Sequence, residues 1–361
     1  MESPAPLLHL KKLHVGLGLR PIRPNLATSP DLGKPVGPSG VQASPLTREN
    51  GPDNRPALAA SDLAMILLLA FAAAAALLPR SFAHRAAWLA AHCCVPPARN
   101  MARLIQAAGN FDPTTARVAA YQHLRLRALA LLYFARGLIF GSHYTTELVG
   151  EEHIKAALAN GRGAVLWISD FIFAGDVSKI GLSERGYWFS HLSRPEHGFS
   201  ETRFGLRFLN PIRIRFELRY LRERVVHTRE QPKRARARLL QHLRENRLVS
   251  ISANAYEGRR LQQVDVLGGR LKLAPGAPAT AFQSGAALLP VFVAPCPQPP
   301  HFRIVVEPAI PLPGEEQAEA IKKALSAYAP LLERYIVENP EVWRGWRDLD
   351  VGDPLPETAL A

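Results

Sequence analysis

The chain has 361 residues, which is enough for one large domain with appendages or for two modest domains. Its 47% hydrophobic and 21% charged residues are typical of a globular core, and its three cysteines exclude a disulfide framework and show no metal-ligand spacing. The formal net charge of +13 predicts an anionic partner, which could be a nucleic acid, a membrane surface or an acidic substrate. Residues 203–247 hold 14 basic and 4 acidic side chains, an excess that a solvated helix face would explain equally well.

The N-terminal part divides into a proline-rich segment and a hydrophobic one. The first sixty residues contain ten prolines and little periodicity, so they cannot bury enough apolar surface to offset the entropy of ordering, and we expect residues 1–60 to be disordered. A hydrophobic helix is expected at 61–80. Its uncharged part, 63–78, has sixteen residues, fewer than the roughly 20 that a bilayer span needs. A short membrane anchor, an interfacial helix and a buried core helix all remain open, and the arginines that follow favour membrane association.

A helical lead-in is expected at 81–148. Apolar residues recur there at three-to-four spacing, as in an amphipathic helix, and Asn110-Phe111-Asp112-Pro113 interrupts the pattern and can cap the next helix. Several arginines accompany the apolar residues, a pattern suited to an anionic surface. The sequence therefore predicts a helical, membrane-associated region ahead of the main domain.

From residue 149 onward, expected strands alternate with expected helices. The strands are predicted at 164–168, 186–192, 247–253, 287–295 and 302–307, and the helices at 151–160, 233–245, 277–284 and 317–339. The first strand, AVLWI, is apolar throughout, as is usual for a strand buried on both faces. This alternation predicts an α/β domain over 149–347, with a mostly parallel sheet flanked by helices, and a flexible tail at 348–361.

Three sets of short sequence segments, called phrases below, occur within this domain in a characteristic order. The first is VGEEHI at 149–154 with GRGAVL at 161–166, the second is LGG at 267–269 with PGAP at 275–278 and SGAALLPV at 284–291, and the third is NPEVWRGWR at 339–347. Together they resemble the lipid A biosynthesis (lauroyl/myristoyl) acyltransferases of the lysophospholipid acyltransferase superfamily. The resemblance implies a glycerolipid acyltransferase-like fold.

The same resemblance makes one departure visible. In that family a His-x4-Asp/Glu motif follows the first strand, and its histidine acts as general base on a hydroxyl that attacks an acyl thioester. Here the strand leads into WISDFIFAGD at 167–176, which contains no histidine. Asp170 stands where the family histidine would fall, and Asp176 lies one residue beyond the carboxylate position. Both are candidate catalytic groups in a divergent member, and helix capping is an equal alternative.

The most polar stretch is HLSRPEHGFSETRFG at 191–205, which follows the second expected strand. Loops at this end of such a sheet surround the active site, so His191 and His197 are candidate bases, with a hydrogen-bonded loop histidine as the alternative. The residues expected to bind substrate are Arg194, Ser200, Arg203 and Asn254. A guanidinium can hold a phosphate or carboxylate in a bidentate manner, and an asparagine after the third strand stands where similar enzymes have an aspartate.

These observations predict a membrane-associated acyltransferase. It would move an acyl chain from an acyl carrier protein or coenzyme A thioester to a hydroxyl of a glycolipid or saccharide, without a metal or other cofactor. The resemblance and the cysteine usage predict a place at the inner (cytoplasmic) membrane, with the catalytic domain facing the cytoplasm. A membrane lipid or glycolipid is the expected partner, and the basic segment matches no nucleic-acid-binding module. The alternative is a catalytically inactive protein of the same fold that binds an anionic lipid or glycan.

Overall fold

The computed structural model describes residues 55–93, 95–108, 111–141, 144–228, 231–254, 261–296, 301–314 and 316–352. Nearly all of the segment predicted to be disordered, 1–60, therefore lies outside the described residues, as does the end of the chain from 353. The helices are α1 (Ala60–Ala76), α2 (Arg80–Cys93), α3 (Val95–Ala107), α4 (Pro113–Phe140), α5 (Glu151–Ala159), α6 (Ala174–Ser183), α7 (Asn210–Leu218), α8 (Pro232–Arg244), α9 (Gly276–Ser284) and α10 (Gln317–Glu338). Three short helical turns are η1 (Gly205–Leu209), η2 (Pro340–Val342) and η3 (Gly345–Arg347).

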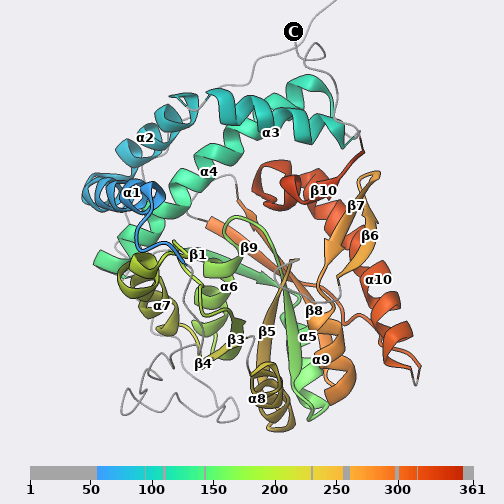
Figure 1. Ribbon diagram of the computed structural model, residues 1–361. Coiled ribbons are helices and arrows are strands. Elements are labelled where there is room, and N and C mark those ends of the chain that lie inside the picture. Colours follow the sequence, from blue (N-terminus) through green and yellow to red (C-terminus); the bar gives the residue numbers. More distant parts are fainter. Residues whose placement is uncertain are drawn as a thin grey trace, which may run out of the picture. The chain divides into compact units, whose positions relative to one another are not determined.

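A seven-stranded sheet forms the centre of the fold (Figure 1). Its strands, in spatial order, are β1 (Thr145–Val149), β9 (His301–Val306), β8 (Ala287–Pro295), β2 (Ala164–Ser169), β5 (Leu248–Ala253), β3 (Phe189–Ser193) and β4 (Glu223–Val226). All neighbours pair in parallel except β8 and β9, which are antiparallel. The predicted α/β fold, with a mostly parallel sheet flanked by helices, is confirmed.

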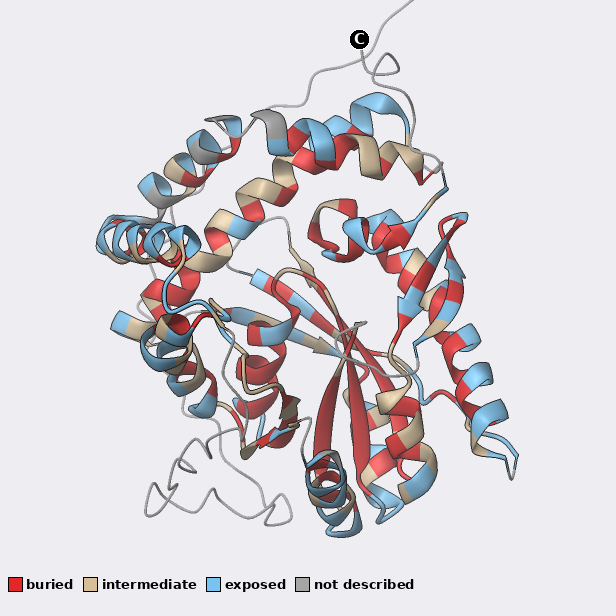
Figure 2. Ribbon diagram, in the orientation of Figure 1, coloured by how far each residue is buried: buried red, intermediate tan, exposed pale blue. Residues whose placement is uncertain are grey.

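Every residue of β2 is buried, and its neighbours β5 and β8 are buried over most of their length (Figure 2). Helix α6 contacts β1, β2, β8 and β9, whereas α8 and α9 pack against each other and contact β5. The chain moves toward β3 through α6 and back toward β8 through α8 and α9. Right-handed crossovers in these opposite directions put α6 on one face of the sheet and α8 and α9 on the other.

Five strands of the described residues lie where none was predicted: β1, β4, β6 (Gln262–Val266), β7 (Gly269–Leu273) and β10 (Leu349–Asp350). Strand β1 belongs to the main sheet although it precedes the predicted domain start at 149. Strands β6 and β7 form a small antiparallel sheet with β10, so the predicted flexible tail at 348–361 begins with a paired strand. Its pairing with β7 supplies hydrogen bonds that a flexible tail would lack.

The third phrase of the sequence packs against the end of β2. Phe171 forms a bridge with Trp343, Ile172 N donates to Val342 O at 2.8 Å, and Arg344 N donates to Asp170 O at 3.1 Å. Trp343 and Trp346 are almost wholly buried, and the Trp346 indole donates to Pro340 O at 2.9 Å. The C-terminal phrase thus packs beside the end of β2, which Asp170 directly follows.

The predicted hydrophobic helix at 61–80 is observed as α1. It packs on α4 through the alanines Ala72, Ala75 and Ala76 and exposes its larger side chains, among them Leu67 at 70% and Phe71 at 62%. This is the reverse of an ordinary amphipathic helix, whose large apolar side chains face inward. Among the described residues, no helix is both long enough and apolar enough to cross a membrane.

Trp343→Ala is expected to lower the free energy of unfolding by about 3–5 kcal/mol, because it empties a fully packed site at the end of β2. Urea denaturation followed by circular dichroism measures the change. Trp88→Ala is the matched control: Trp88 is 52% exposed, so its loss should cost less than about 1 kcal/mol. Equal effects of the two substitutions would contradict the packing described for the C-terminal phrase.

Candidate active site

The sheet reverses its winding direction between β2 and β5. The chain leaves β2 toward β3 on one side and leaves β5 toward β8 on the other. In open α/β sheets, ligands bind beyond the carboxyl ends of the strands at such a switch point. Asp170 follows β2 and Asn254 follows β5, so both lie at this position. The topology therefore predicts a ligand site among the loops at this edge.

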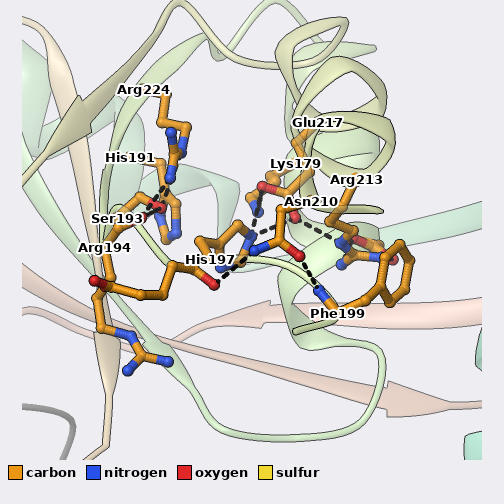
Figure 3. Close-up of polar contacts among 12 residues, drawn as sticks. Lys179, His191, Ser193, Arg194, His197, Phe199, Asn210, Arg213, Glu217 and Arg224 are labelled. Carbon is orange, nitrogen blue, oxygen red and sulfur yellow. Dashed lines mark hydrogen bonds and ion pairs between the residues drawn. The ribbon is translucent and has the colours of Figure 1, made fainter. Parts of the chain in front are cut away.

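A cluster of charged side chains lies at the same edge, between α6, α7 and the loop after β3 (Figure 3). At its centre is the carboxylate of Glu217, which is 1% exposed. One of its oxygens lies 2.9 Å from Lys179 Nζ and the other lies 2.8 Å from Arg213 Nε. The His197 ring nitrogen Nε2 lies 2.9 and 3.0 Å from the two oxygens. Arg213 also forms a bidentate pair with Asp176, and these five residues are called the Glu217 cluster below.

The charges of the cluster balance when His197 is neutral, since Lys179 and Arg213 oppose Glu217 and Asp176. Burial acts to raise the pKa of the Glu217 carboxyl, but the charges of Lys179 and Arg213 and the His197 hydrogen bond outweigh it. The pKa is held well below its usual range, so the carboxylate is ionised at neutral pH. Burial opposes the charge of Arg213 in the same way, and Asp176 and Glu217 overcome it and raise the pKa of the guanidinium.

The backbone that presents His197 is held by Asn210, at the start of α7. Its side-chain oxygen accepts from Phe199 N at 2.7 Å and from Ser200 N at 3.1 Å, and its amide donates to Ser200 O at 2.7 Å. Gly198 has a φ of 151°, and a Cβ there would lie 2.4 Å from the Asn210 side chain. Only glycine fits at this point. The loop is therefore fixed directly beside His197, whose side chain is 31% exposed.

The two candidate histidines have different surroundings. His191 is buried, and its Nδ1 is hydrogen-bonded to Ser250 Oγ at 2.8 Å. Burial and the nearby Lys179 charge hold the pKa of His191 well below its usual range, so its ring stays neutral. The ring centroids of His191 and His197 are 6.4 Å apart. Glu196, whose spacing from His191 matches the family motif, instead pairs with Arg55 at 2.6 Å.

The two candidate aspartates are separated. Asp176 belongs to the Glu217 cluster. The Asp170 carboxylate lies 3.5 Å from Arg344 Nη1, and burial raises its pKa against the opposing effect of that arginine. Among the described residues, no hydrogen bond or ion pair joins Asp170 to the Glu217 cluster. The structure thus brings together three of the four predicted catalytic residues, His191, His197 and Asp176.

The predicted substrate-binding residues are more dispersed. Arg194 is 29% exposed and lies 3.7 Å from Glu201, Arg203 is exposed, and Asn254 is half-buried and accepts from Ala274 N through its backbone. Ser200 has a structural contact, because its hydroxyl donates to Asp62 at 2.5 Å. A role of these four in substrate binding stays a prediction. No group of three or more His, Cys, Asp or Glu side chains suited to a metal occurs in the described part of the chain.

The loop that carries His197 is also tied to the start of α1. The buried carboxylate of Asp62 accepts from Ser200 Oγ, from Thr202 Oγ1 at 2.8 Å and from Ala59 N at 2.8 Å. The hydrogen bond from Ser200 is the main reason that the pKa of Asp62 is lowered. Arg203 N and Phe204 N donate to the backbone of Pro56 and Ala57. These contacts, called the Asp62 clasp below, join α1 to the candidate site.

Sequence reasoning missed Lys179, Asn210, Arg213 and Glu217. Lys179 had a visible signal, because a lone lysine within the apolar helix segment VSKIGL needs a buried partner. Glu217 follows His197 by twenty residues, and no local spacing connects them.

Residues 141–346 match the family described as bacterial lipid A biosynthesis acyltransferase. The chain belongs to this family. The match covers more than half of the chain, including the whole central sheet from β1 to β9, the Glu217 cluster and the C-terminal phrase as far as Trp346. No curated protein matches the chain. Membership supports a general acyltransferase function and makes the carboxyl edge of the sheet the place to look for its chemistry.

Glu217→Gln is expected to destabilise the protein by about 3–5 kcal/mol, because Lys179 and Arg213 would keep buried charges without their shared carboxylate. Thermal and urea unfolding measure the loss. Glu147→Gln removes a comparable ion pair with Arg303 in which both side chains are more than half exposed, and it should cost less than about 1 kcal/mol. A Glu217→Gln protein as stable as the parent would contradict the central role of this carboxylate.

Proposed function

We propose that this protein is an acyltransferase whose general base is His197. It transfers an acyl chain from a coenzyme A or acyl carrier protein thioester to a hydroxyl of a membrane glycolipid or saccharide. The observation that carries the proposal is the pairing of the partly exposed His197 with the buried, ionised carboxylate of Glu217. A histidine oriented by a carboxylate is the unit that this reaction needs, and here it comes from the loop after β3.

The geometry assigns the two ring nitrogens. An ionised carboxylate only accepts hydrogen bonds, so His197 Nε2 carries the hydrogen that points to Glu217. Nδ1 is then the nitrogen that takes the proton from the acceptor hydroxyl. The hydroxyl oxygen attacks the thioester carbonyl, a C–O bond forms, the C–S bond breaks, and the imidazolium returns its proton to the leaving thiolate. Glu217 stabilises the transient imidazolium, and Lys179 and Arg213 keep that carboxylate ionised.

A second function is favoured by a specific observation. In the alignment inferred from the sequence, Asp170 stands where the family histidine would fall, and the Asp170 carboxylate is paired with Arg344. In this alternative, the fold binds an anionic lipid or glycan without transferring an acyl group. Substitution of His197 separates the two functions, because only acyl transfer needs its imidazole.

We also propose that the protein works on a membrane surface, at the cytoplasmic side of the inner membrane. Leu63, Leu67 and Phe71 recur at four-residue spacing on α1, and each is more than half exposed. Phe82, Trp88 and Leu89 of α2 are exposed to a similar degree. A lipid surface would cover such side chains, and the Asp62 clasp joins α1 to the loop of His197. The net charge of +13 complements anionic headgroups.

His197→Ala is expected to lower acyl transfer by about 10²–10⁴-fold, the usual contribution of a positioned general base. The assay follows labelled acyl chains from coenzyme A and acyl carrier protein thioesters to extracted membrane glycolipids and saccharides. His301→Ala changes an exposed histidine at the start of β9 and should leave transfer unchanged. Undiminished transfer by the His197→Ala protein would exclude the proposed base. A folded parent protein that transfers no acyl group but binds anionic glycolipid would favour the second function.

Leu67→Glu combined with Phe71→Glu is expected to reduce binding to phosphatidylglycerol-containing vesicles by at least about tenfold, because two apolar side chains would no longer enter the lipid. Co-sedimentation with vesicles measures the bound fraction. Val118→Glu is the matched control, since Val118 is 56% exposed on α4 rather than on α1. Equal binding by the parent and the double variant would contradict docking through α1.

A further inference from the structure

Three arginines gather where α4 meets the C-terminal phrase. Helix α4 packs on η2, and His123 Nδ1 donates to Glu341 O at 3.0 Å across this contact. Arg127 follows His123 by one helical turn, so it lies on the same face of α4. Arg344 and Arg347 follow η2 along the chain, on either side of the buried Trp346. Two segments far apart in sequence thus bring three guanidinium groups to one place.

These guanidiniums carry more positive charge than the nearby carboxylates balance. Arg344 is 52% exposed, and within the described residues its ion pair is the 3.5 Å contact with Asp170. Arg127 and Arg347 are exposed, and neither lies within 4 Å of a carboxylate oxygen in the part of the chain that the structure describes. Asp348 follows Arg347 directly and acts on the Asp170 carboxyl from a distance. Within the described residues, Arg344 is the one member of this group with a carboxylate oxygen within 4 Å.

The titration of a neighbouring group is consistent with this concentration of charge. Burial lowers the pKa of His123 to about 4, and the charges of Arg127, Arg344 and Arg347 contribute to the shift. Desolvation by the surrounding protein lowers the pKa of Arg127 although the residue is exposed overall, and the charges of Arg344 and Arg347 lower that pKa further. Arg344 and Arg347 therefore lie close enough to Arg127 to disfavour its positive charge, and a bound anion would relieve this repulsion.

We propose that Arg127, Arg344 and Arg347 form a phosphate-binding site beside Asp170, at the carboxyl end of β2. Guanidinium groups match the oxygens of a phosphate in a bidentate manner, and three of them suit a diphosphate or a phosphate monoester. The position is next to the switch point, where a sheet of this kind binds its ligand. The site rests on the proposed function for its biological ligand, because thioester carriers and phosphorylated glycolipids both carry phosphate groups.

The site can be tested without catalysis. Inorganic pyrophosphate is titrated into the full-length protein in a calorimeter at low ionic strength, and Arg127→Gln and Arg347→Gln are each expected to weaken its binding about tenfold. Arg117→Gln is the matched control: Arg117 is exposed on α4 but lies ten residues from Arg127 and on another face. Thermal unfolding establishes that each variant is folded. Equal binding by the parent and both variants, or an equal loss with Arg117→Gln, would overturn the site.

Two further arms identify the source of the phosphate. Coenzyme A is compared with pantetheine, which lacks the phosphates, and a diphosphorylated disaccharide lipid is compared with its dephosphorylated form. Loss of the coenzyme A preference in Arg127→Gln and Arg347→Gln supports a donor site, and loss of the preference for the phosphorylated lipid supports an acceptor site. If the variants keep both preferences, the site is overturned.

Binding by the His197→Ala protein distinguishes this proposal from the proposed function. Pyrophosphate affinity should be unchanged in that variant, because His197 belongs to the Glu217 cluster and not to the arginine site. Retained acyl transfer without pyrophosphate binding would overturn the site alone. Retained pyrophosphate binding without acyl transfer in the parent would overturn the proposed function alone.

Discussion

One buried carboxylate connects the elements on which the candidate site depends. Glu217 comes from α7, Lys179 from α6 and His197 from the loop after β3. Lys179 Nζ and His197 Nε2 each lie within 3.0 Å of the Glu217 carboxylate oxygens. An ionised carboxylate in the interior is costly unless cations and hydrogen bonds compensate it. The same compensation fixes the separation of α6 from α7 and the orientation of the imidazole. Stability and the proposed chemistry therefore depend on the same contacts.

The central sheet could be predicted because its strands are buried on both faces. Residues 164–168 are apolar without interruption, and in the structure all of β2 is buried. Strand β1 was missed because Thr145, Thr146 and Glu147 give it the polarity of an edge, where only one side pairs. The small sheet of β6, β7 and β10 was missed for another reason. Its third strand, Leu349–Asp350, is only two residues long and depends on a partner almost eighty residues away.

The candidate site was predictable only in part. The polarity of 191–205 indicated a histidine base, and the structure gives His197 a carboxylate partner. The nearest acidic residue in sequence, Glu196, pairs with Arg55 instead. Local spacing cannot reveal Glu217, because its contact with His197 exists only after a π-helical turn at η1 and helix α7 have folded back. Long-range pairing of this kind is decided by topology and burial, which short sequence windows do not contain.

The Asp62 clasp connects α1, whose large apolar side chains face outward, to the loop that presents His197. An exposed leucine face costs free energy in water, and the alanine contacts of α1 with α4 and its polar N-terminal anchor help to hold α1 in this orientation. That anchor is the Asp62 carboxylate, whose partners Ser200 and Thr202 lie in the loop that presents His197. A force that moves α1, such as insertion of its outer face into lipid, acts on this loop through short hydrogen bonds rather than through a flexible linker. The helix that faces outward and the loop that presents the candidate base are therefore mechanically one unit.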